Sequence, residues 1–143
     1  MPVRKGHGEW RGDLMKGSGT LGTESGALKG LSYSFSSRFE SGKGTNPEEL
    51  LAAAHAACYS MALSGALSGK GYTVRSIRTE DSVSIEKQGD GFAITTIEIS
   101  TEASVDGIDD ATFQKFAEET KAGCPVSKAL AGPKMVLHAR LKK

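Results

Sequence analysis

One long apolar segment, from Leu50 to Leu67, dominates the hydrophobic pattern of the chain. It is apolar or small on almost every side and is interrupted mainly by His55 and a few serines. A helix with this pattern is either buried at the centre of a protein or spans a membrane. Because the segment is rich in alanine, carries a central histidine and is poor in leucine, isoleucine and valine, we interpret it as the core helix of a soluble domain.

The residues that flank this segment predict where the helix begins and ends. Asn46 is a favourable N-cap residue and Pro47 suits the first helical position. Glu48 and Glu49 follow, where the helix dipole favours negative charge. Gly69 is a typical helix stop. The pattern therefore predicts one long helix that carries Cys58 near its middle.

Strand patterns precede and follow this helix. Residues 7–36 contain short, glycine-separated runs typical of a small antiparallel sheet, and residues 36–45 predict a loop that holds Arg38 and Phe39. After the helix, apolar residues alternate through V-R-S-I-R-T, then S-V-S-I-E and, beyond a Gly-Asp-Gly turn, F-A-I-T-T-I-E-I-S. The last two runs predict a hairpin with a bulge near Thr95 and Thr96, where the alternation slips.

The C-terminal third predicts two further helices and a strand. The first helix runs from about Asp109 to Ala122 and stops at Gly123. A short second helix begins at Cys124, because the following Pro125 suits its first position. The chain then ends on the alternating run M-V-L-H-A-R-L-K, which is typical of a strand.

The order of these elements predicts the fold class. Strands, helix, strands, helices and strand without regular βαβ alternation indicate an α+β fold, and 143 residues predict a single domain over 1–143. The formal charge of +1 does not indicate binding to nucleic acid or to anionic membranes. The first residues lack the apolar region of a signal peptide, and two cysteines are too few for a disulfide-rich secreted scaffold. We therefore expect a cytoplasmic protein.

The two cysteines are the first candidates for chemistry. Cys58 is either a small core residue or a reactive thiol, and the reactive interpretation requires a nearby cation to favour the thiolate. Its own helix offers none, so Arg38 is the better candidate and Arg11 the competitor. His55, three residues before Cys58, is either a proton acceptor or, more commonly for such a residue, a hydrogen-bonded structural histidine.

Cys124 differs because it stands at the start of a helix. The dipole and the free N–H groups there favour a thiolate, so local rules nominate Cys124 as the more acidic thiol. One of the two glutamates Glu48 and Glu49 could hold an arginine fork in place, although glutamate is common at helix starts for the dipole alone. A metal site built from His55, Cys58 and Cys124 matches no familiar zinc spacing and is disfavoured.

Two segments carry a family resemblance. T-N-P-E-E-L-L-A-A-A-H-A-A-C-Y-S-M-A-L-S and K-A-G-C-P-V-S-K-A-L resemble the OsmC/Ohr family, which comprises the osmotically inducible protein C and organic hydroperoxide resistance proteins of bacteria. The likeness runs from about Gly6 to the C-terminus. His55 and the glycine before Cys124 favour the osmotically inducible branch. Tyr59 departs from the phenylalanine expected there and adds a hydroxyl near the site.

This resemblance implies a thiol-dependent peroxidase that reduces organic hydroperoxides to alcohols in stress defence. Cys58 matches the peroxidatic cysteine and Cys124 the resolving cysteine, which overrules the dipole argument for Cys124 as the attacking thiol. Arg38 matches the arginine that activates the thiolate, and Glu48 the carboxylate that binds this arginine. Neither a cofactor nor a metal is implied, and an external dithiol would reduce the disulfide.

The resemblance also implies an α+β, OsmC-like fold, with antiparallel sheets around a long buried central helix in an intertwined homodimer. The sites would lie at the subunit interface, and apolar side chains would favour organic hydroperoxides; we expect Phe39, Tyr59 and Met61 among them. Two other classes stay open: a thiol–disulfide exchange protein, against which the lack of a CxxC motif argues, and a non-catalytic dimeric binding protein whose cysteines are merely packed.

Overall fold

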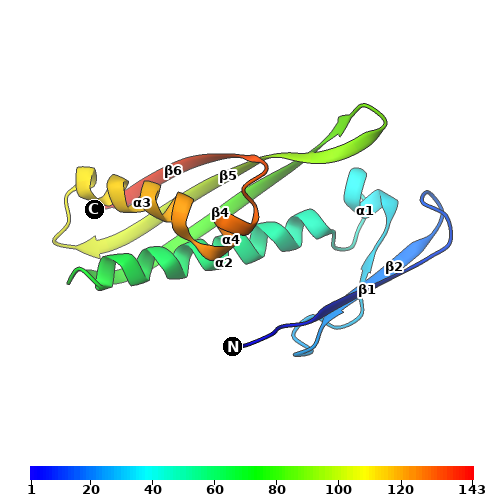
Figure 1. Ribbon diagram of the computed structural model, residues 1–143, viewed down its shortest axis with the longest axis horizontal. Coiled ribbons are helices and arrows are strands. Elements are labelled where there is room, and N and C mark those ends of the chain that lie inside the picture. Colours follow the sequence, from blue (N-terminus) through cyan, green and yellow to red (C-terminus); the bar gives the residue numbers. More distant parts are fainter. The chain divides into compact units, whose positions relative to one another are not determined.

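The computed structural model describes residues 1–143, which form two compact units, Met1–Leu50 and Leu51–Lys143 (Figure 1). The first unit is a small sheet with one short helix. The second contains a larger sheet and the longer helices. The mixed helix and sheet content confirms the α+β prediction. That the whole chain is a single domain stays a prediction.

The first unit is built on a glycine-rich antiparallel meander, as the sequence predicts. Its strands are β1 (Gly6–Arg11), β2 (Ser18–Thr23) and β3 (Leu31–Tyr33), in the order β1-β2-β3. The predicted loop over 36–45 is wrong in its first part, because Phe35–Phe39 form the short helix α1. A reciprocal capping box between Ser34 and Ser37 satisfies the first turn of this helix, which explains how five residues hold a helical shape.

Helix α2 (Pro47–Ser68) is the long helix that the sequence predicts. Its N-cap is Asn46, whose Oδ1 accepts a hydrogen bond of 2.8 Å from the backbone N–H of Glu49. At the other end the N–H of Tyr72 donates to the carbonyl of Leu67, and Gly71 between them has φ +90°, a conformation that favours glycine. The helix therefore starts and stops where the local sequence indicates.

The sheet of the second unit is formed by β4 (Thr73–Gln88), β5 (Gly91–Asp106) and β6 (Lys134–Lys142). Strands β4 and β5 form the predicted hairpin, but they run much further than the predicted segments, and β4 continues without a break through Glu80 and Asp81. The predicted bulge is confirmed: Ser84 pairs with Thr96 and Ile85 with Ile94, so that Thr95 is the extra residue.

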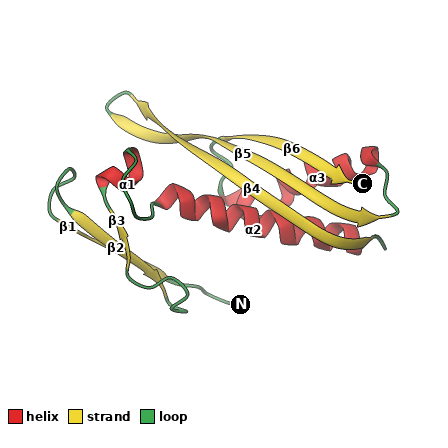
Figure 2. Cartoon of the chain, turned by 180° about the vertical axis from the view of Figure 1, so that it is seen from behind, coloured by secondary structure: helices red, strands yellow, loops and turns green.

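A helical crossover joins β5 to β6, which pairs with it in parallel. The crossover contains α3 (Asp110–Gly123), capped by Asp109, and α4 (Pro125–Ala129), capped by Cys124. Both helices and the strand agree with the sequence prediction. In Figure 2, which is turned by 180° from Figure 1, the sheet lies nearer the viewer than α2 and the crossover helices. The helices therefore cover one face of the sheet.

The core of the second unit lies between α2 and this sheet. On the inward face of α2 every fourth residue is fully buried. These residues are His55, Tyr59, Leu63 and Leu67. By length and composition α2 could cross a membrane, with a mean hydropathy of 1.4, but its buried stripe packs as a core helix does. Within the second unit the buried residues of the helix all lie on this stripe, and Met61 on another face is 80% exposed.

Candidate functional site

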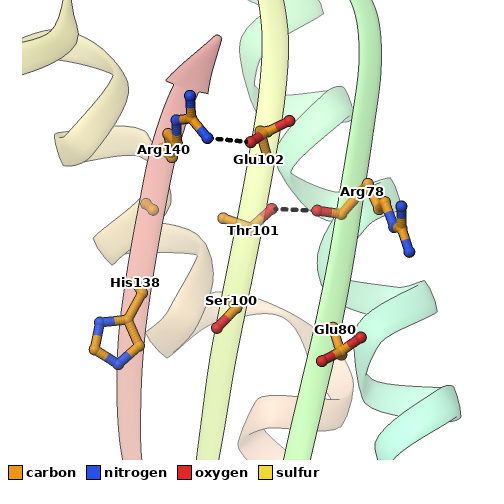
Figure 3. A pocket seen from close by; sticks show the side chains of 8 residues that line it. Arg78, Glu80, Ser100, Thr101, Glu102, His138 and Arg140 are labelled. Carbon is orange, nitrogen blue, oxygen red and sulfur yellow. Dashed lines mark hydrogen bonds and ion pairs between the residues drawn. The ribbon is translucent and has the colours of Figure 1, made fainter.

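The outer face of the large sheet has a hollow lined mainly by polar and charged side chains. This hollow encloses about 560 Å³ and contains no cysteine (Figure 3). Its charged side chains pair across the strands; for example, Arg140 Nη1 donates to Glu102 Oε2 at 2.9 Å. The residues that line it are Arg78, Glu80, Ser100, Thr101, Glu102, His138, Ala139 and Arg140. We therefore place the candidate site on the opposite, helix-covered side of the sheet.

The two cysteines meet on that side, within the second unit. Cys58 comes from the middle of α2 and Cys124 from the start of α4, and Cys124 is near enough to raise the pKa of the Cys58 thiol. Both are free thiols. Cys58 is half-buried, whereas Cys124 is 2% exposed. A small molecule from solvent can therefore reach Cys58 more readily than Cys124.

The surroundings of Cys58 do not by themselves favour a thiolate. Burial raises the pKa of the Cys58 thiol; the backbone N–H of Val126 lowers this pKa, and the neighbouring Cys124 raises it again. The net direction is upward, and no positively charged side chain is among the groups that act on this thiol. Reactivity at neutral pH therefore requires positive charge from elsewhere.

Cys124 acts as the N-cap residue of α4, as the Cys-Pro sequence predicts. Its Sγ accepts a hydrogen bond of 3.3 Å from the backbone N–H of Ser127 and also lies 3.2 Å from the Ser127 hydroxyl. The side chain of Ser127 is thus in direct contact with the sulfur of the second candidate cysteine. Ser127 is itself 4% exposed.

Ser127 connects Cys124 to a buried histidine and aspartate. Its Oγ lies 2.7 Å from Nε2 of His55, and Nδ1 of His55 is hydrogen-bonded to Oδ2 of Asp81 on β4. The side chains of His55 and Asp81 are both fully buried. Burial raises the pKa of Asp81, and the neighbouring His55 opposes this rise. Three segments far apart in the sequence therefore form one polar network inside the core.

Arg38 and Glu48 form an ion pair within the first unit. Arg38 Nη2 donates to Glu48 Oε1 at 2.8 Å, and Arg38 Nε lies 3.1 Å from the same oxygen. Glu48 is buried, whereas the Arg38 side chain is 37% exposed. The guanidinium also lies over the Phe39 ring, 5.2 Å from its centroid. Nε also lies 3.3 Å from Oε2, so two guanidinium nitrogens bind one carboxylate, which fixes the plane of the guanidinium and leaves Nη1 unused by this pair.

The other candidate arginine is placed differently. Arg11 on β1 binds Glu9 of the same strand at 2.6 Å, and both side chains are largely exposed. Such an exposed pair is weakly held. Of the two arginines, Arg38 has the more firmly oriented side chain.

The expectation that Tyr59 lines an apolar pocket is wrong. Tyr59 is fully buried in the core, and its hydroxyl donates a hydrogen bond of 2.8 Å to the carbonyl oxygen of Ala117 on α3. Burial raises the pKa of this phenol further, so the hydroxyl stays protonated. Tyr59 is therefore a structural residue. Met61, by contrast, is exposed and Phe39 is half-buried.

The structure thus brings the predicted site residues together in two pairs, Cys58 with Cys124 and Arg38 with Glu48. Asp81 and Ser127 were not singled out by the sequence. A signal for Asp81 exists: it has the same strand parity as the inward-facing Ile77 and Val83. Ser127 gives no comparable signal, because its contacts depend on how α4 packs against α2.

Comparison with known proteins shows the family of the chain. The family model described as OsmC-like protein matches residues 40–138. The chain is also 53% identical, over 127 residues and 89% of each chain, to a protein of Escherichia coli strain K12 named Peroxiredoxin OsmC.

Solved structures show the same fold. The organic hydroperoxide resistance protein OhrB of Bacillus subtilis superposes with a TM-score of 0.66 at 25% identity, covering 96% of this chain and 98% of its own. An OsmC-like protein from Mycoplasma pneumoniae gives a TM-score of 0.74 at 16% identity, with 99% of both chains covered. With a matching family model, a relative above half identity and this shared fold, the chain belongs to the OsmC family.

Proposed function

We propose that this protein is a cysteine-based peroxidase that reduces organic hydroperoxides to alcohols. The observation that carries the proposal is the pair of free thiols, one half-buried and one buried, that lie close together within a single unit. The names of the relatives, Peroxiredoxin OsmC and organic hydroperoxide resistance protein, support the same chemistry.

In the proposed reaction Cys58 attacks first, because it is the more accessible thiol. Its thiolate attacks the distal oxygen of the hydroperoxide, the O–O bond breaks, and the alkoxide leaves as an alcohol after taking a proton. Cys58 is then a sulfenic acid. Cys124 displaces its hydroxyl as water and forms the disulfide, which an external dithiol reduces. The cycle uses neither a metal nor an organic cofactor.

Arg38 supplies the positive charge in this scheme. Because burial disfavours the Cys58 thiolate, an opposite charge is needed to lower the pKa of the thiol. Glu48 holds the Arg38 guanidinium by two contacts, and Nη1 remains to donate hydrogen bonds to the peroxide oxygens as charge moves to the leaving oxygen. This role rests on the family resemblance and on the Arg38–Glu48 pair.

The protein is further proposed to be a cytoplasmic homodimer with its sites at the subunit interface. The support in this chain is the apolar surface of α2 that one chain leaves exposed, which includes Ala53, Ala57 and Met61. An apolar helix face of this kind is typical of a protein interface.

Thiol counting tests the peroxidase proposal. The pre-reduced protein is titrated with cumene hydroperoxide, and free thiols and intact mass are followed. We expect two thiols to be lost for about one equivalent of peroxide, with formation of one disulfide and no added oxygen. Dithiothreitol should then restore both thiols and allow repeated turnover.

Two results would favour the alternatives. Oxidation by a small disulfide but not by the hydroperoxide would indicate a thiol–disulfide exchange protein. Thiols that neither consume hydroperoxide nor react with iodoacetamide at neutral pH would indicate a binding protein whose cysteines are merely packed.

A further inference from the structure

The polar network next to Cys124 is difficult to explain as a stabilising feature. Asp81 is fully buried, and only its Oδ2 is hydrogen-bonded; the other oxygen, Oδ1, has no partner in the chain. A buried carboxylate oxygen without a partner lowers the stability of the fold, whereas a well-packed apolar residue at the same position would not. Buried groups that weaken the fold in this way are expected at functional sites.

The order of the hydrogen bonds gives the network a direction. With the carboxylate of Asp81 at Nδ1, the proton of a neutral His55 is inferred to sit on Nδ1, which leaves Nε2 as an acceptor. The hydroxyl of Ser127 then donates to Nε2, and its oxygen can accept from the thiol of Cys124. The network therefore leads from the sulfur to the imidazole.

We propose that Ser127, His55 and Asp81 form a buried proton relay that takes the thiol proton of Cys124 when this cysteine attacks the sulfenic acid of Cys58. The proposal rests on the peroxidase function proposed above and concerns its second step. Ser127 contacts the reacting sulfur, whereas His55 and Asp81 act through Ser127 as positioning residues.

The relay balances protons and electrons. The Cys124 proton passes to Ser127 Oγ while the Ser127 proton passes to His55 Nε2, and Asp81 stabilises the resulting imidazolium. The Cys124 sulfur attacks the Cys58 sulfur, the S–O bond breaks, and hydroxide leaves. His55 then returns the proton through the network, so that the hydroxide becomes water. No additional oxidant is needed, because the sulfenic acid is the oxidised partner.

The burial of Cys124 explains why a relay is needed. A thiol that is 2% exposed has little access to water as a proton acceptor. The network has the order of a Ser–His–Asp triad, but Ser127 is itself buried and contacts a thiol sulfur. Its geometry therefore suits proton transfer from Cys124 rather than attack on a substrate.

The titratable groups around His55 are few. They are Asp81 on β4, Cys124 at the start of α4, and Cys58 and Tyr59 on α2; Glu118 on α3 acts on Tyr59. Asp81 is the only charged side chain that contacts the imidazole.

Stopped-flow measurement of a single turnover tests the relay. Sulfenic acid formation is followed by the consumption of cumene hydroperoxide, and disulfide formation by quenching and intact mass. In Ser127→Ala we expect disulfide formation to slow by about 100-fold relative to sulfenic acid formation, because a positioned general base typically raises the rate of such a step by at least about 100-fold. Dimedone should then trap the accumulated sulfenic acid. Asp81→Asn should act in the same direction.

The pH profile separates a relay from a structural role. In Ser127→Ala the rate of the second step should rise about tenfold per pH unit, because hydroxide must replace the relay, while the wild-type profile is much flatter. Ser127→Thr, which retains the hydroxyl, should restore the wild-type profile. Ser60→Ala is the matched control: it removes another hydroxyl of the core, which donates to Thr79 Oγ1 at 2.7 Å, and should change neither step.

The outcomes distinguish this relay from the peroxidase proposal itself. Disulfide formation by Ser127→Ala at the wild-type rate and pH profile would overturn the relay, and so would equal slowing of both steps. Absence of peroxide consumption by the wild type would instead overturn the underlying peroxidase function.

Discussion

At the scale of single residues, the interior of the second unit keeps polar groups that a core built for stability would avoid. Asp81 is the extreme case, with a buried carboxylate and one unpartnered oxygen. Tyr59 and Thr79, by contrast, are also inward-facing but have hydrogen-bond partners. Asp81 lies next to the cysteine that is proposed to carry out the second step, and a functional site is where a buried polar group without a partner is expected.

A pH-dependent stability difference follows from this burial. Because burial raises the pKa of Asp81, the folded state binds more protons than the unfolded state at pH values between the unfolded pKa, about 3.9, and the higher folded pKa. The free energy of unfolding should therefore lose this contribution as the pH rises through that window. Urea unfolding of Asp81→Asn and wild type at about pH 4 and pH 7 should show the variant gaining relative stability at the higher pH.

An opposite-sign control is available on the surface. The guanidinium of Arg75 binds Asp106 at 2.7 and 2.8 Å and holds the pKa of that carboxyl below its usual value. Asp106→Asn should therefore lose stability relative to wild type as the pH rises from the lowered folded pKa to the unfolded pKa, above which the wild-type pair contributes fully. If the Asp81→Asn difference followed this direction, or did not change with pH, the account of Asp81 would be contradicted.

At the scale of elements, the capped helix ends position the proposed chemistry. The capping box of α1 fixes the turn that carries Arg38, and the start of α2 presents Glu48 to it. The start of α4 places Cys124 as its cap. The starts of α2 and α4 are specified by local residues and were placed from the sequence, whereas the sequence analysis expected a loop where α1 forms.

The alkylation of Cys58 tests the role given to Arg38. In a Cys124→Ser background, the rate of iodoacetamide reaction rises with pH as the Cys58 thiolate forms. Because burial already raises the pKa of this thiol, removing the activating charge in Arg38→Ala should shift the midpoint upward by at least about one pH unit. Arg11→Ala should leave the midpoint unchanged, since Arg11 forms an exposed pair with Glu9.

An unchanged midpoint in Arg38→Ala would contradict activation by this arginine. A shift in Arg11→Ala instead would transfer the role to the competitor. Arg38→Lys retains the charge but not the two-contact fork, so an intermediate midpoint is expected.

The elements also show where sequence reasoning succeeds. Cap residues and a continuous apolar run predict α2, and apolar periodicity predicts α3, β6 and the bulge at Thr95, because these patterns depend on local sequence and simple burial. The predicted runs V-R-S-I-R-T and S-V-S-I-E, however, leave out the polar residues Glu80 and Asp81 between them. The pairing of these two residues with β5 keeps the strand continuous, and His55 supplies the partner that makes an inward Asp81 tolerable.

The proposed site was predictable only in part for the same reason. The candidate cysteines and Arg38 could be nominated from the two long motifs and the family resemblance. The contact of Ser127 with His55 joins α4 to α2 across 72 sequence positions, and no local pattern specifies such a contact. The burial of Tyr59 likewise depends on its partner on α3.

At the scale of the whole molecule, the proposed chemistry is divided between the two compact units. The ion pair of Arg38 and Glu48 belongs to Met1–Leu50, whereas both thiols and the relay belong to Leu51–Lys143. The second unit therefore contains the redox-active pair and the groups proposed to move its protons. The first contains the charge proposed to activate the attacking thiol.

The central claim is that Cys58 attacks the hydroperoxide and Cys124 resolves the product. Its most direct test is to treat reduced Cys124→Ser and Cys58→Ser with one equivalent of cumene hydroperoxide in the presence of dimedone and to map the adduct by peptide mass spectrometry. The account predicts rapid peroxide consumption by Cys124→Ser with the adduct on Cys58, and no consumption by Cys58→Ser. An adduct on Cys124 in Cys58→Ser, with Cys124→Ser inert, would contradict it.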